Sequence, residues 1–285
     1  MNDEYSVGKW GKYCVVNYYG DNLAVTRKLY TDKNADGISI LAKNGAPSSL
    51  ENLQEFKGLK VILFHDTPQL QIDGLKHLPA LEEIMLCGTS QVLDFSWVPN
   101  LQRLICDWHV GMFRNSESSN LLSLSMEKYK SKKGDLSDFP SFPYLQRIEL
   151  LQSSIQNLTG INRFPTLKEI HLTYLSKLEE LGRLNLPNLI EFVAEKCKKI
   201  SDHDQIGNCL SLQELKLHEC GTINSLYFIN HLKNLKSFRF INTDVLDGDL
   251  SPLKRLPDVY FTEKRHFSGK VKDFNQTPKQ WNIIS

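Results

Sequence analysis

The 285-residue sequence lacks several features that would assign it to a well-defined functional class. It has no excess of charge of one sign: 34 Lys and Arg residues stand against 33 Asp and Glu residues, which leaves a net charge of +1. Proteins that bind nucleic acids or membrane surfaces usually carry an obvious basic excess. We therefore expect no nucleic-acid partner and no membrane association. The lysines between Lys128 and Lys133 could touch phosphates, but we expect them to be solvated.

Long apolar runs are absent as well. No window approaches the roughly 18 uninterrupted apolar residues that a membrane-spanning helix needs. The N-terminal stretch MNDEYSVGKWGKY has no apolar segment behind basic residues, so we expect no secretory signal. The C-terminal WNIIS carries no sorting or lipidation motif. Together these absences predict a cytoplasmic protein.

The sequence also lacks the patterns that usually accompany catalysis or metal binding. It has no Gly-rich phosphate loop, no G-x-S-x-G and no H-E-x-x-H. Its six cysteines lie far apart, without paired metal-ligand spacing or a disulfide framework, so we expect reduced thiols. We therefore predict no enzyme activity, no cofactor and no metal.

A repeat dominates what is present. The pattern L-x-x-I/L-x-L recurs every 20 to 24 residues, in copies that begin at Leu59, Leu81, Leu101, Leu121, Leu145, Leu167, Leu189, Leu212 and Leu235. The alternating end of each copy predicts a short strand with one buried face. A looser apolar pattern follows, such as Ile155 to Phe164, which predicts a helical turn that ends at Pro165. Such units bury their apolar edges only when stacked, which predicts a parallel-stranded solenoid.

This pattern resembles the leucine-rich-repeat family over about residues 35 to 266. The spacing is similar to that of the short 22-residue subclass, which includes internalins and phosphatase regulators. The resemblance implies an α/β solenoid, a horseshoe with a parallel concave sheet and short helices or 3-10 turns on the convex side. We expect one continuous domain, with an N-terminal β-rich cap at 1–34, repeats at 35–258 and a C-terminal cap and tail at 259–285.

Two details of the repeat carry further expectations. In the cap, Tyr13 to Tyr19 and Leu23 to Thr26 flank Gly20-Asp21-Asn22, which predicts a hairpin. The family usually places Asn three residues after the last leucine of each strand, where its side chain bonds backbone of the neighbouring repeat. Here that column includes Cys197 and Cys220, which we expect to be buried bonding residues rather than nucleophiles.

The concave face follows from strand alternation, because residues between the buried leucines point away from the core. Its N-terminal half is apolar, which predicts either a contact patch or a surface covered by the N-terminal hairpin or by a long loop. Its C-terminal half mixes glutamates with histidines, which fits either a solvated surface or a docking strip for a basic partner. The expected partner-binding residues are Leu63, Met85, Ile105, Asp107, Trp108, Glu149, His171, Tyr174, Glu195, Lys216, His218 and Arg239.

The function that we predict is a non-enzymatic protein-binding module, monomeric on its own. The sequence looks like bacterial cytoplasmic repeat proteins, some of which are immunity proteins that neutralise a cognate toxin, so a toxin domain is one candidate partner. The alternatives are a regulatory subunit or scaffold of another enzyme, a secreted effector, and a hydrolase using Cys87 with His65. His171, Glu195 and His218 lie on consecutive strands and could approach one metal, but we expect that spacing to be coincidental.

Overall fold

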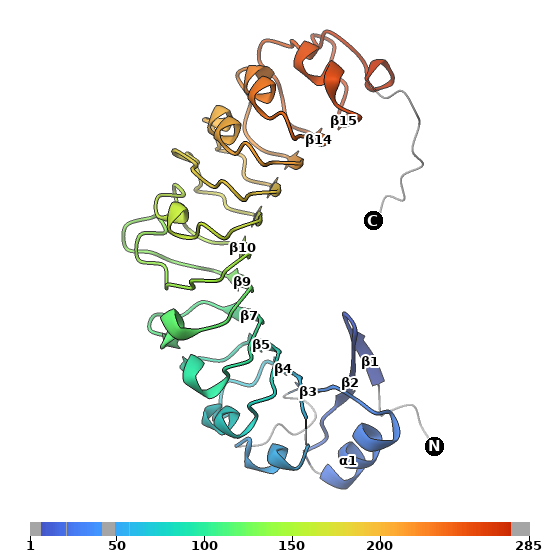
Figure 1. The fold of residues 1–285 in the computed structure, drawn as a ribbon, viewed down its shortest axis with the longest axis vertical. Coiled ribbons are helices and arrows are strands. Elements are labelled where there is room, and N and C mark those ends of the chain that lie inside the picture. The colour runs from blue at the N-terminus through green and yellow to red at the C-terminus, as the bar shows by residue number, and fades with distance from the viewer. Residues whose placement is uncertain (1–6, 21, 42–48, 57, 275–285) are drawn as a thin grey trace. The chain divides into compact units, whose positions relative to one another are not determined.

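The computed structural model describes residues 7–20, 22–41, 49–56 and 58–274 (Figure 1). The chain forms two compact units, which are described separately below. Unit 1 comprises Met1–Tyr129 and Pro140–Gln146, and unit 2 comprises Lys130–Phe139 and Arg147–Ser285. Within the described ranges, no helix is both long and apolar enough to cross a membrane.

The sheet of unit 1 contains seven of the described strands, in the order β1, β2, β3, β4, β5, β7 and β9. Strands β1 and β2 are antiparallel, and every later pair in this unit is parallel. A separate parallel pair joins β6 (Leu93–Asp94) to β8 (Phe113–Arg114). The sheet strands are β1 (Val7–Trp10), β2 (Tyr13–Asn17), β3 (Gly37–Leu41), β4 (Val61–His65), β5 (Glu83–Cys87), β7 (Arg103–Asp107) and β9 (Ser123–Glu127).

The sheet of unit 2 contains six described strands in sequence order, and all of its pairs are parallel. The register places equivalent repeat positions side by side, and one such buried row contains Ile148, Ile170, Phe192, Leu215 and Phe238. Each of these side chains gains roughly 2 kcal/mol from burial. The strands are β10 (Arg147–Leu151), β11 (Glu169–Thr173), β12 (Glu191–Glu195), β13 (Glu214–His218), β14 (Ser237–Ile241) and β15 (Asp258–Phe261).

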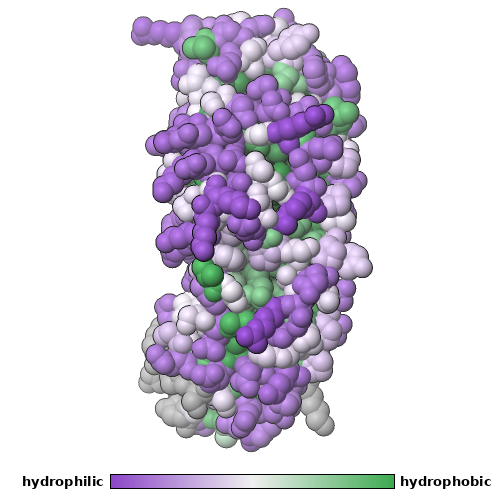
Figure 2. Space-filling model, turned by 90° about the vertical axis from the view of Figure 1, so that its left-hand side faces the viewer, coloured by the Kyte–Doolittle hydropathy of each residue, from purple (hydrophilic) through white to green (hydrophobic). Residues whose placement is uncertain are grey.

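The return segments on the other side of most repeats contain 3-10 helices rather than α-helices, and those between β9 and β10 and between β11 and β12 contain turns and bends instead. The looser apolar pattern at Ile155 to Phe164 is buried as expected but yields only one short turn, at 161–163. Hydrophilic residues dominate this outer surface, with isolated hydrophobic ones between them (Figure 2). The 3-10 helices are η2 (Glu51–Glu55), η3 (Asp73–His77), η4 (Phe95–Trp97), η5 (Ser116–Ser118), η6 (Ile161–Arg163), η7 (His203–Asn208), η8 (Leu226–His231), η9 (Ser251–Arg255) and η10 (Val271–Asp273).

Hydrogen bonds between neighbouring repeats supplement the apolar stack. The Asn188 side chain donates to the Pro165 carbonyl at 2.9 Å, and Asn234 donates to the Leu210 carbonyl at 3.0 Å. The expected role of Cys220 is confirmed, because its buried thiol donates to the Ala194 carbonyl at 3.3 Å. Cys197 likewise is buried and donates to the Leu172 carbonyl at 3.5 Å.

The N-terminal segment differs from the expected hairpin. Its two strands are β1 and β2, joined by a turn in which Gly11 has a φ of 55°. The second run, from Leu23 to Thr26, starts a helix instead, α1 (Leu23–Asp32). The Asn22 side chain caps this helix by accepting a hydrogen bond from the Val25 amide at 3.3 Å. The four residues from Leu23 to Thr26 were too few to distinguish a strand from the first turn of a capped helix.

At the C-terminal end, the repeat continues one strand beyond residue 258. Strand β15 pairs with β14 in the same parallel register. Phe261 on this strand packs edge-on against both Phe267 and Phe274, and all three rings are buried. These aromatic rings therefore shield the last strand from water.

Candidate functional site: the inner face of the sheet

In unit 1 the N-terminal hairpin covers part of the expected binding surface. Leu63 and Met85 are only 5% and 8% exposed, because they pack in one cluster with Tyr13 and Val15 of strand β2. In the folded chain these two side chains therefore expose little surface to a partner. Of the two alternatives that the sequence left open, the covered surface is the one observed.

Polar contacts fix the hairpin over this surface. The Trp10 indole donates to Glu83 at 2.7 Å, and the Tyr13 hydroxyl donates to Glu82 at 2.6 Å. Gly37, on strand β3 between β2 and β4, has no Cβ. A Cβ at this position would lie 2.8 Å from the Cβ of Val61 on β4, so only glycine permits β3 and β4 to approach this closely.

The remaining unit 1 candidates lie beside the covered cluster. Ile105 is partly buried and packs against it. Asp107 accepts a hydrogen bond from the Gly88 amide at 2.8 Å, which gives its carboxylate a structural role. Trp108 is half-buried and packs edge-on against Tyr129, with 4.8 Å between the ring centroids. Trp108, one of the expected partner-binding residues, therefore exposes only part of its side chain.

The chemistry of Cys87 does not favour the hydrolase alternative. Burial and the carboxylate of Asp107 raise the pKa of the Cys87 thiol to about 11, so at neutral pH it is protonated and weakly nucleophilic. His65 faces Cys87 on the neighbouring strand, and burial lowers the pKa of its imidazole. A nucleophile needs the opposite shift in thiol pKa.

The inner face of unit 2 carries a connected network of ion pairs. Lys216 donates to Glu191 at 2.6 Å and also lies 3.2 Å from Glu214. Arg147 bonds Glu169 and lies 3.7 Å from Glu149. Of these six side chains, Glu214 is 49% exposed and the other five are 19–38% exposed, so water screens their interactions only in part.

His171 lies at the centre of this network. Its Nδ1 is 3.1 Å from the Arg147 guanidinium, and its Nε2 is 3.4 Å from Glu191. Burial and Arg147 lower the pKa of His171, so the ring is neutral at pH 7. Because guanidinium nitrogens only donate, Nδ1 accepts and the ring proton resides on Nε2, toward Glu191.

The other unit 2 candidates lie on the same face. Arg239 donates to Asp258 at 3.0 Å, and burial lowers the pKa of His218. The Tyr174 ring is 46% exposed, and the Lys196 ammonium lies over it, 4.6 Å from the centroid. Within the described part of the chain, the carboxylate of Glu195 makes no hydrogen bond or ion pair.

The structure brings together a metal-capable group that differs from the one considered in the sequence. One ligand atom from each of Glu169, His171 and Glu191 lies within 4.8 Å of the others, and among the described residues no second group of this kind occurs. Glu195 and His218 do not belong to it.

Two inner-face residues escaped the sequence prediction, namely Arg147 and Asp258. Each occupies the first position of its strand, two residues before the central inner-face column. Strand alternation puts positions two residues apart on the same face. If the sequence prediction had also included the position two residues before the central inner-face residue of each strand, it would have named both Arg147 and Asp258.

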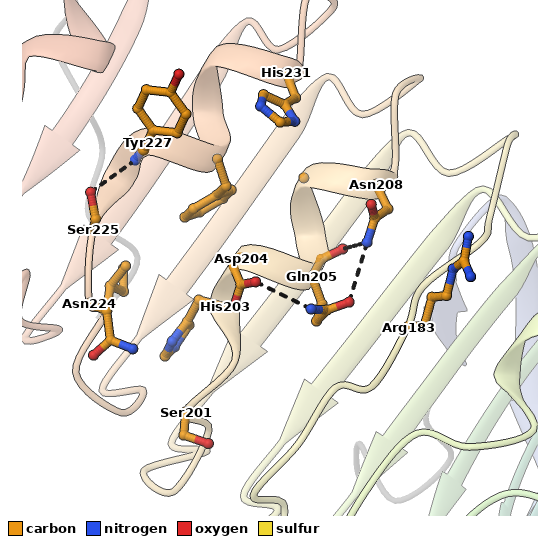
Figure 3. A pocket seen from close by; sticks show the side chains of 13 residues that line it. Arg183, Ser201, His203, Asp204, Gln205, Asn208, Asn224, Ser225, Tyr227 and His231 are labelled. Atoms are coloured by element: carbon orange, nitrogen blue, oxygen red, sulfur yellow. Dashed lines mark hydrogen bonds between the residues drawn. The ribbon is translucent and has the colours of Figure 1, made fainter.

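A cavity of about 750 Å³ lies on the outer side of unit 2, between η7 and η8 (Figure 3). Its lining combines polar residues with Ile223 and Phe228, and the polar residues Asp204, Gln205 and Asn208 already bond to one another. His203 is 2% exposed, and both its ring nitrogens are buried without a hydrogen-bond partner. Because these nitrogens have no exposed surface, a molecule in the cavity could not reach them without rearrangement of the side chains.

Comparisons with known proteins agree with the repeat architecture. A family model described as the LRR domain of the endo-beta-N-acetylglucosaminidase EndoS matches residues 117–248, which is less than half of the chain. No curated protein sequence matches.

Several solved structures are similar in fold. An internalin from Listeria monocytogenes aligns with a TM-score of 0.50 and 17% identity, over 85% of this chain and 72% of the internalin. TLR13 in its complex with ssRNA13 aligns at 0.47 and 17%, over 79% of this chain but only 38% of TLR13. A leucine-rich-repeat protein of Leptospira interrogans aligns at 0.41 and 14%, over 81% of this chain and 79% of that one.

The regular repeat spacing, the parallel in-register strands, the 3-10 return segments and the family match all agree. The chain therefore has the leucine-rich-repeat fold.

Proposed function

We propose that this protein is a non-enzymatic binding module whose partner is another protein, held on the inner face of unit 2. The observation that supports this most strongly is the ordered set of partly exposed charged and aromatic side chains on, or directly after, strands β10–β15. Ion pairs hold these side chains in fixed positions, which lowers the entropy lost when a partner binds.

Tyr174 and Glu195 provide the contact groups for this partner. Tyrosine combines a large apolar ring with a polar group and is a frequent hot spot in interfaces. Tyr174 also retains its exposed ring at the edge of the ion-pair network, next to Lys196. Glu195 carries a carboxylate that is not engaged within the described part of the chain, so it is available to a cationic group.

The experiment is a binding measurement with the full chain and a protein captured by it from extracts of the source cells. We expect Tyr174→Ala and Glu195→Lys each to weaken binding about tenfold or more. The matched controls lie outside the inner face: Tyr227→Ala removes a ring that is 68% exposed, and Glu180→Lys reverses an exposed charge. If the controls weaken binding and the two inner-face variants do not, the proposal is wrong.

The narrower form of this proposal is that the partner is a toxin domain, which the chain neutralises by covering its active site. The varied side chains of the inner face support it, because one specific partner needs a distinctive set of contacts. Co-expression with the product of the adjacent gene tests this form. Rescue of growth by the wild type but not by Glu195→Lys supports it, and absence of rescue by the wild type excludes it.

A further inference from the structure

The group formed by Glu169, His171 and Glu191 has an unusual charge environment. The ion-pair network around His171 contains four carboxylates, those of Glu149, Glu169, Glu191 and Glu214, but only two cations, Arg147 and Lys216. Apart from His171, the network has a net charge of −2 (two positive and four negative groups). One divalent cation would neutralise it.

Atoms of Glu169, His171 and Glu191 that can bind a metal lie close to one another. In Glu191, Oε1 bonds Lys216 at 2.6 Å, while Oε2 faces His171 Nε2 at 3.4 Å. That Nε2 atom is buried and makes no hydrogen bond. The third ligand, Glu169, stands on the same strand as His171, two residues earlier and therefore on the same face.

We propose that Glu169, His171 and Glu191 form a zinc-binding site on the inner face of unit 2. A nitrogen and two carboxylate oxygens suit Zn²⁺, whose catalytic and open sites combine three protein ligands with a water. Mg²⁺ and Ca²⁺ prefer oxygen ligands alone and suit this set poorly. Ligands about 2.0–2.2 Å from zinc lie roughly 3.3 Å apart, so the group, now spread over up to 4.8 Å, contracts when it binds.

Zinc binding requires one local exchange. The metal takes the lone pair of Nε2, so the ring proton moves to Nδ1, where it faces the Arg147 guanidinium at 3.1 Å. Two donors cannot bond each other. Arg147 therefore turns away from His171. It then forms an ion pair with Glu149, whose carboxylate already lies 3.7 Å from the guanidinium. Arg147 acts as a competitor for the site, which gives the proposal a distinctive test.

The test is calorimetric titration of zinc chloride into the metal-free full chain at pH 7.5. We expect one zinc ion per chain, binding weakened at least tenfold by His171→Ala and by Glu191→Gln, and no binding of magnesium. Arg147→Ala removes the competitor and should tighten zinc binding. His218→Ala, an inner-face histidine outside the group, is the matched control and should leave the affinity unchanged.

Two results would overturn the proposal. One is zinc binding of equal strength in the wild type, His171→Ala and Glu191→Gln, which would place the ion elsewhere, for example at the half-buried thiols of Cys14 and Cys87. The other is the absence of zinc binding in both the wild type and Arg147→Ala. Circular dichroism of each metal-free variant establishes that it is folded, so that lost binding reports the site itself.

Discussion

His203 is a buried polar residue without a compensating interaction. Burial lowers the pKa of its imidazole to about 4, against an ordinary value of 6.5. The unfolded chain therefore binds one more proton than the folded chain between about pH 6.5 and pH 4. Stability is fully retained above this window and falls as the pH drops through it. A shift of about 2.5 units (6.5 minus 4) corresponds to a loss of roughly 3 kcal/mol.

We predict that His203→Leu raises stability at pH 7, because it removes two unsatisfied nitrogens whose burial costs about 1–3 kcal/mol. The gain should be larger at pH 4.5, where the wild type loses stability. Urea unfolding followed by circular dichroism at both pH values measures this. His231→Leu, at an exposed histidine in the same region, is the control. If His203→Leu and the wild type differ equally in free energy of unfolding at both pH values, His203 does not have the lowered pKa described above.

Among the elements, the β1–β2 hairpin has the clearest separate role, since it covers apolar inner-face residues of unit 1. We predict that Trp10→Ala uncovers Leu63 and Met85 and lowers the free energy of unfolding by roughly 2–3 kcal/mol. Lys9→Ala, on the exposed face of the same strand, should have little effect.

The uncovering is measured by the fluorescence of an apolar dye that binds exposed hydrophobic surface. Trp10→Ala should raise the signal, and Lys9→Ala should not. A Trp10→Ala variant with wild-type dye binding and stability would mean that the hairpin is not needed to shield this patch.

The sequence predicted the repeated elements better than the single ones. The strands were predictable because the same spacing recurs nine times, so one irregular copy is outweighed by its neighbours. Helix α1 occurs once and has no second copy to support the prediction. For the inner face, alternation identified which residues share a surface, but only the fold shows that a distant hairpin covers Leu63 and that Arg147 contacts His171.

In a solenoid each repeat contacts mainly its neighbours. A destabilising substitution should therefore lower the stability of its own and adjacent repeats more than that of distant ones. Gly221 offers a test, since a Cβ there would lie 2.0 Å from the Ile200 carbonyl oxygen. We predict that Gly221→Ala lowers stability by about 2–4 kcal/mol. Hydrogen exchange should accelerate in β12–β14 but not in β4–β5.

Gly8→Ala is the control for this variant, because a Cβ at Gly8 meets no atom within 4 Å. It should leave exchange rates unchanged throughout. Accelerated exchange in β4–β5 of Gly221→Ala, to the same degree as in β12–β14, would show that the chain unfolds as a single cooperative block.

The residue that directly follows each strand of the repeats has an unusual backbone conformation. It has left-handed backbone geometry in most repeats, yet glycine occupies it only at Gly88; the others are Asp66, Lys128, Gln152, Tyr174, Lys196, Glu219 and Asn242. A non-glycine residue in this conformation costs about 1 kcal/mol or more. Glycine would remove that strain in every repeat, so the seven side chains along this edge of the sheet each lower the stability of the fold.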